Sequence, residues 1–111
     1  MDNIITFEDF TKVDLRVGTI IEVNDFPEAR QPAYRLLIDF GPLGIKKSSA
    51  QITTRYKKEE LLNRQIVAVV NFQKKQIGKF MSECLVLGAV KGKDVILLNP
   101  EHHVKNGSVI C

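Results

Sequence analysis

Two apolar runs of strand length, residues 66–72 and 84–90, stand out in the hydrophobic pattern of the chain. Both are rich in β-branched and aliphatic side chains, and such continuous runs are typical of strands that are buried on both faces, as in a closed barrel. The eleven residues between the runs, 73–83, mix lysines with apolar side chains. A loop of this composition packs poorly, so we interpret it as the working surface of the protein.

Three further strands are predicted in the first half of the chain. Residues 15–23 form a long first strand, in which Gly18 indicates a bend or a bulge. A polar loop with two prolines, residues 24–32, separates this strand from a second strand at 34–41. A Gly-Pro-Leu-Gly turn then predicts a hairpin to a third strand at 43–52.

One helix is predicted between the third and fourth strands. Thr53 or Thr54 caps this helix, which covers residues 55–64 with Leu61 and Leu62 turned inward. The order strand, strand, strand, helix, strand, strand is that of the OB-fold, a five-stranded barrel.

We therefore expect residues 1–111 to form a single all-β domain, with one or two short helices and extra segments at both ends. In the OB-fold the binding face lies on the second and third strands, flanked by the loop between the fourth and fifth strands. That loop is residues 73–83, which the apolar pattern also indicates as the working surface.

The two chain ends add segments outside this barrel. A capping box at Thr6 predicts a short N-terminal helix, and residues 95–99 predict a short extra strand. Residues 4–10 and 108–110 are too apolar to remain loose on a small barrel. We therefore expect these end segments to pair across a two-fold axis in a homodimer.

Charge is distributed unevenly along the chain, although the net charge is only +3. Residues 1–28 carry a net charge of −5, and residues 29–93 carry +9. A basic middle segment suggests an anionic partner, most plausibly nucleic acid. The alternative is that these lysines and arginines cover solvated outer faces of the barrel.

Several classes of function are not supported by the sequence. The chain has no Walker-type phosphate loop and no Gly-x-Ser-x-Gly motif, so we expect a protein that is not an enzyme and needs no cofactor. Cys84 lies in an apolar run where burial would make it inert, and the adjacent His102 and His103 point to opposite sides of an extended chain, so we expect no metal site.

The expected location is the cytoplasm. The chain contains no apolar run of about 18 residues, so we expect no stable insertion into a membrane. Its first ten residues are acidic and lack the basic-then-apolar order of a signal peptide.

Four motifs resemble the tRNA-binding domain that is appended to methionyl- and phenylalanyl-tRNA synthetases. They are DLRVGTI (14–20), SSAQIT (48–53), VVNF (69–72) and IGKFMSECLVLG (77–88). The resemblance covers nearly the whole chain and is greatest to the free-standing branch of the family, the CsaA-type export chaperones. It implies an OB-fold homodimer that binds unfolded or export-bound polypeptides, whereas related domains bind tRNA without sequence specificity.

The chain departs from the family pattern in the loop at 73–83 and just after it. Relatives commonly have a proline–basic loop that ends in glycine, whereas this chain has Gln73-Lys-Lys-Gln76, with Gly78 followed by Lys79. Cys84 and Leu85 stand where the synthetase appendages usually carry glycine and methionine. These departures weaken the tRNA-binding interpretation more than they weaken the fold assignment.

Two functions therefore remain, and each has its own candidate residues. In the first, an apolar groove binds extended polypeptide, and Met81 suits this role because its flexible thioether adapts to varied partners. The candidate peptide-binding residues are Phe72, Ile77, Phe80 and Met81.

In the second candidate function, lysines contact the phosphates of tRNA, and polar side chains add contacts as the matched positions do in relatives. The candidate tRNA-binding residues are Asn71, Lys74, Lys75, Lys79 and Ser82.

Overall fold

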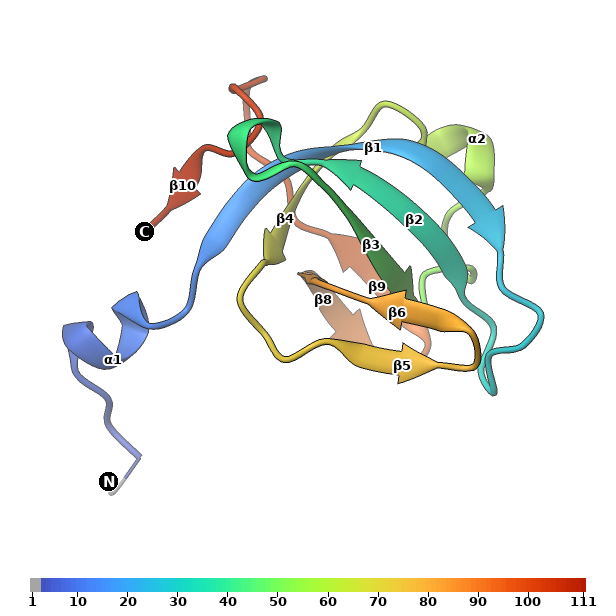
Figure 1. The fold of residues 1–111 in the computed structure, drawn as a ribbon, viewed down its shortest axis with the longest axis horizontal. Coiled ribbons are helices and arrows are strands. Elements are labelled where there is room, and N and C mark those ends of the chain that lie inside the picture. The colour runs from blue at the N-terminus through green and yellow to red at the C-terminus, as the bar shows by residue number, and fades with distance from the viewer. Residues whose placement is uncertain (1–2) are drawn as a thin grey trace.

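Antiparallel strands form the body of the protein in the computed structural model, which describes residues 3–111 (Figure 1). Asp2, which belongs to the acidic N-terminal segment of the sequence, lies outside the described residues. The elements in chain order are α1 (Phe7–Thr11), β1 (Leu15–Asp25), β2 (Tyr34–Asp39), the 3-10 turn η1 (Gly41–Leu43), β3 (Ile45–Ala50), α2 (Lys58–Leu61), β4 (Gln65–Val69), β5 (Lys75–Ile77), β6 (Phe80–Ser82), β7 (Leu85–Val86), β8 (Gly88–Lys91), β9 (Asp94–Leu97) and β10 (Val109–Ile110).

The main sheet has the order β3-β2-β1-β4-β7, and β10 pairs with the start of β1. The long strand β1 changes partner along its length. Its first part pairs with β4, from Leu15 opposite Val69 to Thr19 opposite Gln65. From Thr19 onward it pairs with β2. One strand thus belongs to both halves of the sheet, which curls it toward a barrel.

The barrel is nearly closed by contacts between β3 and the segment that enters β7. The backbone N–H of Glu83 donates to the Lys47 carbonyl at 2.8 Å, and the Ser48 hydroxyl donates to the Cys84 carbonyl at 2.9 Å. Five strands and two short helices in this order confirm the predicted OB-fold.

No bulge lies at Gly18, where the sequence indicated a bend or a bulge. The register between β1 and β2 shifts between Ile20 and Glu22 instead. Gly18 is required by close packing, because a methyl group on its Cα would lie 2.7 Å from the side chains of Ile38 and Phe40. Both of these side chains are fully buried and have little room to move.

The helix α2 is much shorter than predicted and is not capped by a threonine. The backbone N–H of Lys57 donates to the Glu60 carboxylate at 2.8 Å at its start, and Asn63 adopts a left-handed φ of 69° just after its end. Leu61 is fully buried as predicted, but Leu62 is 47% exposed. The prediction failed for Leu62 because the helix ends before this residue can turn toward the core.

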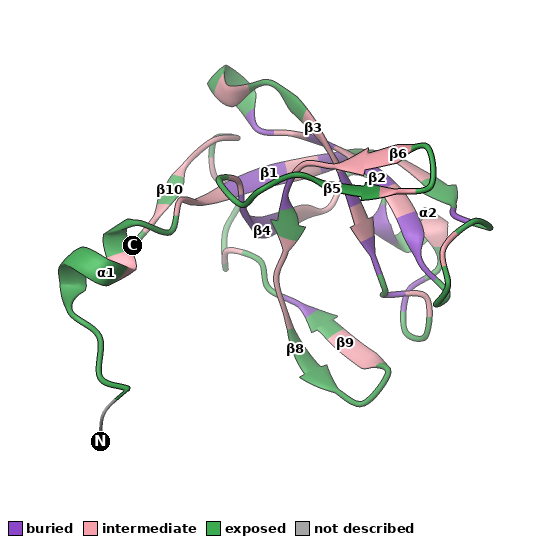
Figure 2. Cartoon of the chain, turned by 60° about the horizontal axis from the view of Figure 1, so that its bottom comes forward, coloured by how far each residue is buried: buried purple, intermediate pink, exposed green. Residues whose placement is uncertain are grey.

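The two dominant apolar runs differ in burial. Strand β4 is buried on both faces from Ile66 to Val69, as predicted. The run at 84–90 is not, because it divides into β7 and β8, and β8 leaves the barrel to pair with β9. Leu85 is 45% exposed and Val90 is 72% exposed. The β8–β9 hairpin projects from the barrel as an arm (Figure 2).

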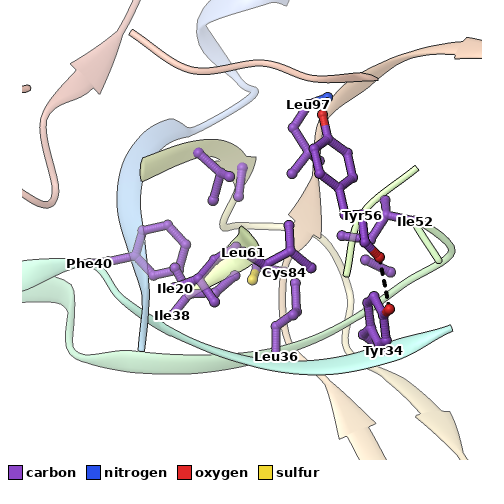
Figure 3. Packing of buried hydrophobic residues seen from close by; sticks show 13 residues of the cluster. Ile20, Tyr34, Leu36, Ile38, Phe40, Ile52, Tyr56, Leu61, Cys84 and Leu97 are labelled. Carbon is purple, nitrogen blue, oxygen red and sulfur yellow. Dashed lines mark hydrogen bonds between the residues drawn. The ribbon is translucent and has the colours of Figure 1, made fainter. Parts of the chain in front are cut away.

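The core lies inside the curled sheet and combines aliphatic side chains with two hydrogen-bonded tyrosines (Figure 3). The Tyr34 hydroxyl donates to the Tyr56 carbonyl at 2.8 Å, and the Tyr56 hydroxyl accepts from the backbone N–H of Leu97 at 3.1 Å. This chain of bonds connects β2, the segment after β3, and the base of the arm. Both buried hydroxyls therefore have hydrogen-bonding partners.

The N-terminal helix α1 stands away from the barrel (Figures 1 and 2). The predicted capping box is present, since Thr6 Oγ1 accepts from the Asp9 N–H at 3.1 Å and the Asp9 carboxylate accepts from the Thr6 N–H at 3.2 Å. Ile4 and Phe7 are 80% and 73% exposed.

In residues 3–111 no helix combines the length and the apolar character needed to cross a membrane.

Candidate functional site

Residues 73–83 form a small hairpin rather than an irregular loop. Strands β5 and β6 pair with Lys75 opposite Ser82 and Ile77 opposite Phe80. Gly78 makes the turn with a φ of 59°, a value that glycine adopts without strain. The Gly78-Lys79 pair between the apolar residues Ile77 and Phe80 was the sequence signal for this hairpin, and our prediction did not use it.

A groove with a cavity volume of about 650 Å³ lies between this hairpin, the segment that follows β3, and the β8–β9 arm. Its lining is mostly apolar and includes Ile52, Phe72, Ile77, Leu85, Val86 and Val95. Side-chain hydroxyl groups and amide groups supplement these apolar side chains, among them Ser49, Ser82, Thr53, Thr54, Gln51 and Gln73. An apolar cavity with a few polar groups is the usual form of a binding site for an extended or small ligand.

The groove is basic. Lys75 of β5 and Lys93 of the turn between β8 and β9 line it from different walls, and no aspartate or glutamate is among its lining residues in the described chain. Both lysines are exposed. A ligand with negative charge would therefore meet favourable potential at this site.

The arm that forms one wall of the groove is tied to the barrel by an ion pair. Arg55 donates to both carboxylate oxygens of Asp94, from Nε at 2.8 Å and from a terminal nitrogen at 2.7 Å. These hydrogen bonds hold the pKa of Asp94 below its ordinary value of 3.8. Sequence analysis did not find this pair, because nothing in the spacing relates two residues that lie 39 positions apart.

The candidate peptide-binding residues do not all lie at one place. Phe72, which is 53% exposed, and Ile77 line the groove. The half-buried Phe80 lies outside it, where its ring packs against Phe26 with a centroid distance of 5.3 Å. Met81 follows Phe80 in the strand, so its side chain is on the opposite face of the hairpin.

The side chains of two candidate tRNA-binding residues form hydrogen bonds with backbone groups of the protein itself. Asn71 accepts from the Asp14 N–H at 2.9 Å and donates to the Lys12 carbonyl at 2.7 Å. The Ser82 hydroxyl accepts from the Ser49 N–H at 3.2 Å.

The three candidate lysines of this set are exposed on the hairpin. Lys74 lies 3.7 Å from the Glu83 carboxylate, so part of its charge is compensated. Lys75 lines the groove, and Lys79 occupies the turn next to Gly78. The hairpin therefore presents its positive charge on more than one side.

Cys84 is buried and has no feature of a nucleophile. Burial raises the pKa of its thiol to about 11, so the thiol stays protonated at neutral pH. Among the described residues no group of histidine, cysteine and carboxylate side chains could hold a metal ion.

The predicted charge pair near the start of β1 is present, with Arg16 Nε donating to Asp14 at 2.6 Å.

The chain is similar to tRNA-binding domains and to chaperones of known structure. A family model described as a putative tRNA binding domain matches residues 15–109. A methionine–tRNA ligase of Pyrococcus furiosus is 40% identical over 106 residues, which are 96% of this chain but only 14% of that protein. The chain thus spans a small part of the length of the curated relatives that it matches.

Two solved structures match along nearly their whole length. The chaperone CsaA of Bacillus anthracis is 54% identical with a TM-score of 0.93, covering 97% of this chain and 99% of that one. The CsaA chaperone of Picrophilus torridus is 55% identical with a TM-score of 0.91, covering 97% of this chain and 100% of that one.

Proposed function

The chain belongs to the tRNA-binding domain family, and from this premise we propose that it is a chaperone that binds unfolded or export-bound polypeptides in the cytoplasm. The observation that carries the proposal is the mostly apolar groove between the β5–β6 hairpin and the β8–β9 arm. Likeness to two CsaA chaperones over nearly the full length of both chains supports it. The activity is binding and release rather than catalysis.

Polypeptide would bind in an extended form. Phe72 and Ile77 provide apolar contacts on the groove wall, while hydroxyl and amide groups can bond to the exposed backbone of the peptide. Phe80 and Met81 lie outside this groove, so the proposal rests on Phe72 and Ile77 rather than on them. Unfolded chains expose apolar side chains and unpaired backbone groups together, so a site with both kinds of partner would favour them over folded proteins.

The chaperone would work as a homodimer. The apolar residues Ile4, Ile5, Phe7 and Val109 are more than half exposed in the single chain. Burial of such side chains in a second copy would remove their apolar surface from water. The segments that carry them are those that the sequence suggested for pairing.

A substitution in the groove tests the proposal. Phe72→Ser removes the exposed ring at the groove, and should weaken binding of reduced, carboxymethylated lactalbumin by about 1–3 kcal/mol if the ring is an anchor. Leu62→Ser is the matched control, because Leu62 is similarly exposed, at 47%, and is not among the residues that line the groove. Equal affinity of the Phe72 variant and the wild type, both folded, would reject the groove as the polypeptide site.

Binding of tRNA is the second candidate function. The observation that favours it is the exposed cations of the β5–β6 hairpin, Lys74, Lys75 and Lys79, in a family described as tRNA-binding. Asn71 and Ser82 would add polar contacts. The triple alanine variant of the lysines should weaken tRNA binding and reduce its salt dependence by about one unit of slope, or slightly less, for each lost phosphate contact. An unchanged slope would remove these lysines from the tRNA interface.

A further inference from the structure

We propose that the groove selects extended polypeptide segments in which an apolar side chain is flanked by carboxylates. The inference rests on the proposed function and specifies the chemistry of its ligand. The apolar lining accepts the central side chain, and Lys75 and Lys93 lie at different walls of the same cavity. An acidic side chain on each flank of the apolar one matches this arrangement of charge.

Lys75 and Lys93 are free to bind a ligand carboxylate, because the carboxylates near them in the described chain form hydrogen bonds and ion pairs with other residues. Asp94 follows Lys93 directly, but both of its oxygens accept from Arg55. Glu83 directly follows Ser82, which lies opposite Lys75 in the hairpin. Its carboxylate, however, accepts from the Lys47 N–H at 2.9 Å and pairs with Lys74. Within residues 3–111 neither Lys75 nor Lys93 has a carboxylate within 4.0 Å of its ammonium group.

The lining of the groove favours an acidic peptide over nucleic acid. A phosphate backbone carries one charge per nucleotide and is usually held by a row of cations with aromatic rings that stack on the bases. The groove has two lysines and a single aromatic ring, Phe72, among its lining residues. Most of its remaining lining is aliphatic or small, which suits a peptide side chain better than a polyanion.

Three matched peptides test this inference. Each has a central Leu-Val-Phe segment in a Gly-Ser chain, flanked on both sides by aspartate, asparagine or lysine. Fluorescence anisotropy in dilute salt should give affinity in the order aspartate, asparagine, lysine, with about a threefold to tenfold step between the first two. The double variant Lys75→Gln/Lys93→Gln should bind all three peptides about equally while keeping its affinity for the asparagine peptide.

The control is the double variant Lys57→Gln/Lys91→Gln, which removes the same charge from exposed positions outside the groove lining. It should preserve the preference for aspartate. Equal binding of the three peptides to the wild type, or a preference that survives in the Lys75/Lys93 variant, would overturn the inference and leave the proposed function intact. Failure to bind even the asparagine peptide would reject both.

Nucleic acid is tested in the same series with an unstructured oligouridylate. The Lys75→Gln/Lys93→Gln variant should lose no more affinity for this probe than Lys75→Gln alone, because Lys93 is not one of the hairpin lysines proposed to contact phosphate. If the variant loses oligouridylate binding and keeps the peptide preference, these two lysines contact phosphate and the inference is wrong.

Discussion

The residue type at some positions of this protein is required by contacts with residues that are far away in the sequence. Gly18 and Asn71 illustrate the point, because neither position has a local pattern that explains it. A side chain at Gly18 would enter the space of Ile38 and Phe40. Asn71 bridges to the backbone of residues 12 and 14, which joins the end of β4 to the start of β1. Partners at such distances cannot be found from spacing alone.

Gly18→Ala is expected to destabilise the barrel. The added methyl group would lie 2.7 Å from two fully buried side chains, so they must shift from their packed positions. Overpacking of this kind costs about 1–3 kcal/mol. Urea unfolding should show a lower midpoint with a similar slope, and an unchanged midpoint would mean that the core has room at this position.

The two cysteines are expected to differ in reactivity. Cys111 is exposed, whereas Cys84 is buried and its thiol pKa is raised to about 11. Titration with Ellman's reagent at pH 8 should release one equivalent per folded chain and two after denaturation. Two rapid equivalents from the folded protein would contradict the burial of Cys84.

The raised pKa of Cys84 also predicts how stability depends on pH. A folded-state pKa above the ordinary value of 9.0 means that the folded protein favours the protonated thiol. This contribution is fully present below about pH 9 and is lost as the pH rises toward about 11. The variant Cys84→Ala should lack this alkaline loss when unfolding is measured across the same range.

At the scale of elements, the strand order was predictable and the details of the second half were not. The apolar pattern and the turn residues were sufficient for β1 to β4, because each strand there has a buried face. The run at 84–90 looked like one buried strand, but β8 pairs with β9 outside the barrel. The hydrophobic pattern shows which residues are apolar, but it does not show which other strand covers them in the fold.

The candidate site was predicted only in part for the same reason. The segment 73–83 was identified as important, and Phe72, Ile77 and Lys75 do line the groove. The opposite wall comes from the β8–β9 arm, which is joined to the barrel by the pair between Arg55 and Asp94 and by the hydrogen bond between Tyr56 and Leu97. A wall that is held by such long-range contacts leaves no local signal in the sequence.

Release of the arm is expected when this pair is broken. Asp94→Asn removes the charge, and hydrogen exchange of the β8–β9 amides should become faster while exchange in β4 stays slow. The pKa of Asp94 is held below 3.8, so the same release in the wild type should occur only as the pH falls below that value. Glu101→Gln, at an exposed acidic residue in the C-terminal tail, is the control. Unchanged exchange in Asp94→Asn would show that Tyr56 and Leu97 hold the arm without the ion pair.

At the scale of the whole molecule, the barrel leaves both chain ends outside its own core. Helix α1 has no buried residue, and β10 pairs only at the start of β1. We expect a homodimer in which these segments become covered. Sedimentation at micromolar concentration should give about twice the chain mass of 12.5 kDa. A species of 12.5 kDa alone would contradict the dimer.

We propose that this OB-fold barrel binds unfolded polypeptide through an apolar groove. Side-by-side titrations with reduced, carboxymethylated lactalbumin and with bulk tRNA over a salt series test this proposal. Between about 50 mM and about 200 mM salt, tRNA affinity should fall steeply because binding releases counterions. Polypeptide affinity should fall far less, because burial of apolar surface does not depend on counterions and only the contribution of the two groove lysines is screened by salt. Polypeptide binding that is absent, or that collapses in parallel with tRNA binding, would contradict the claim.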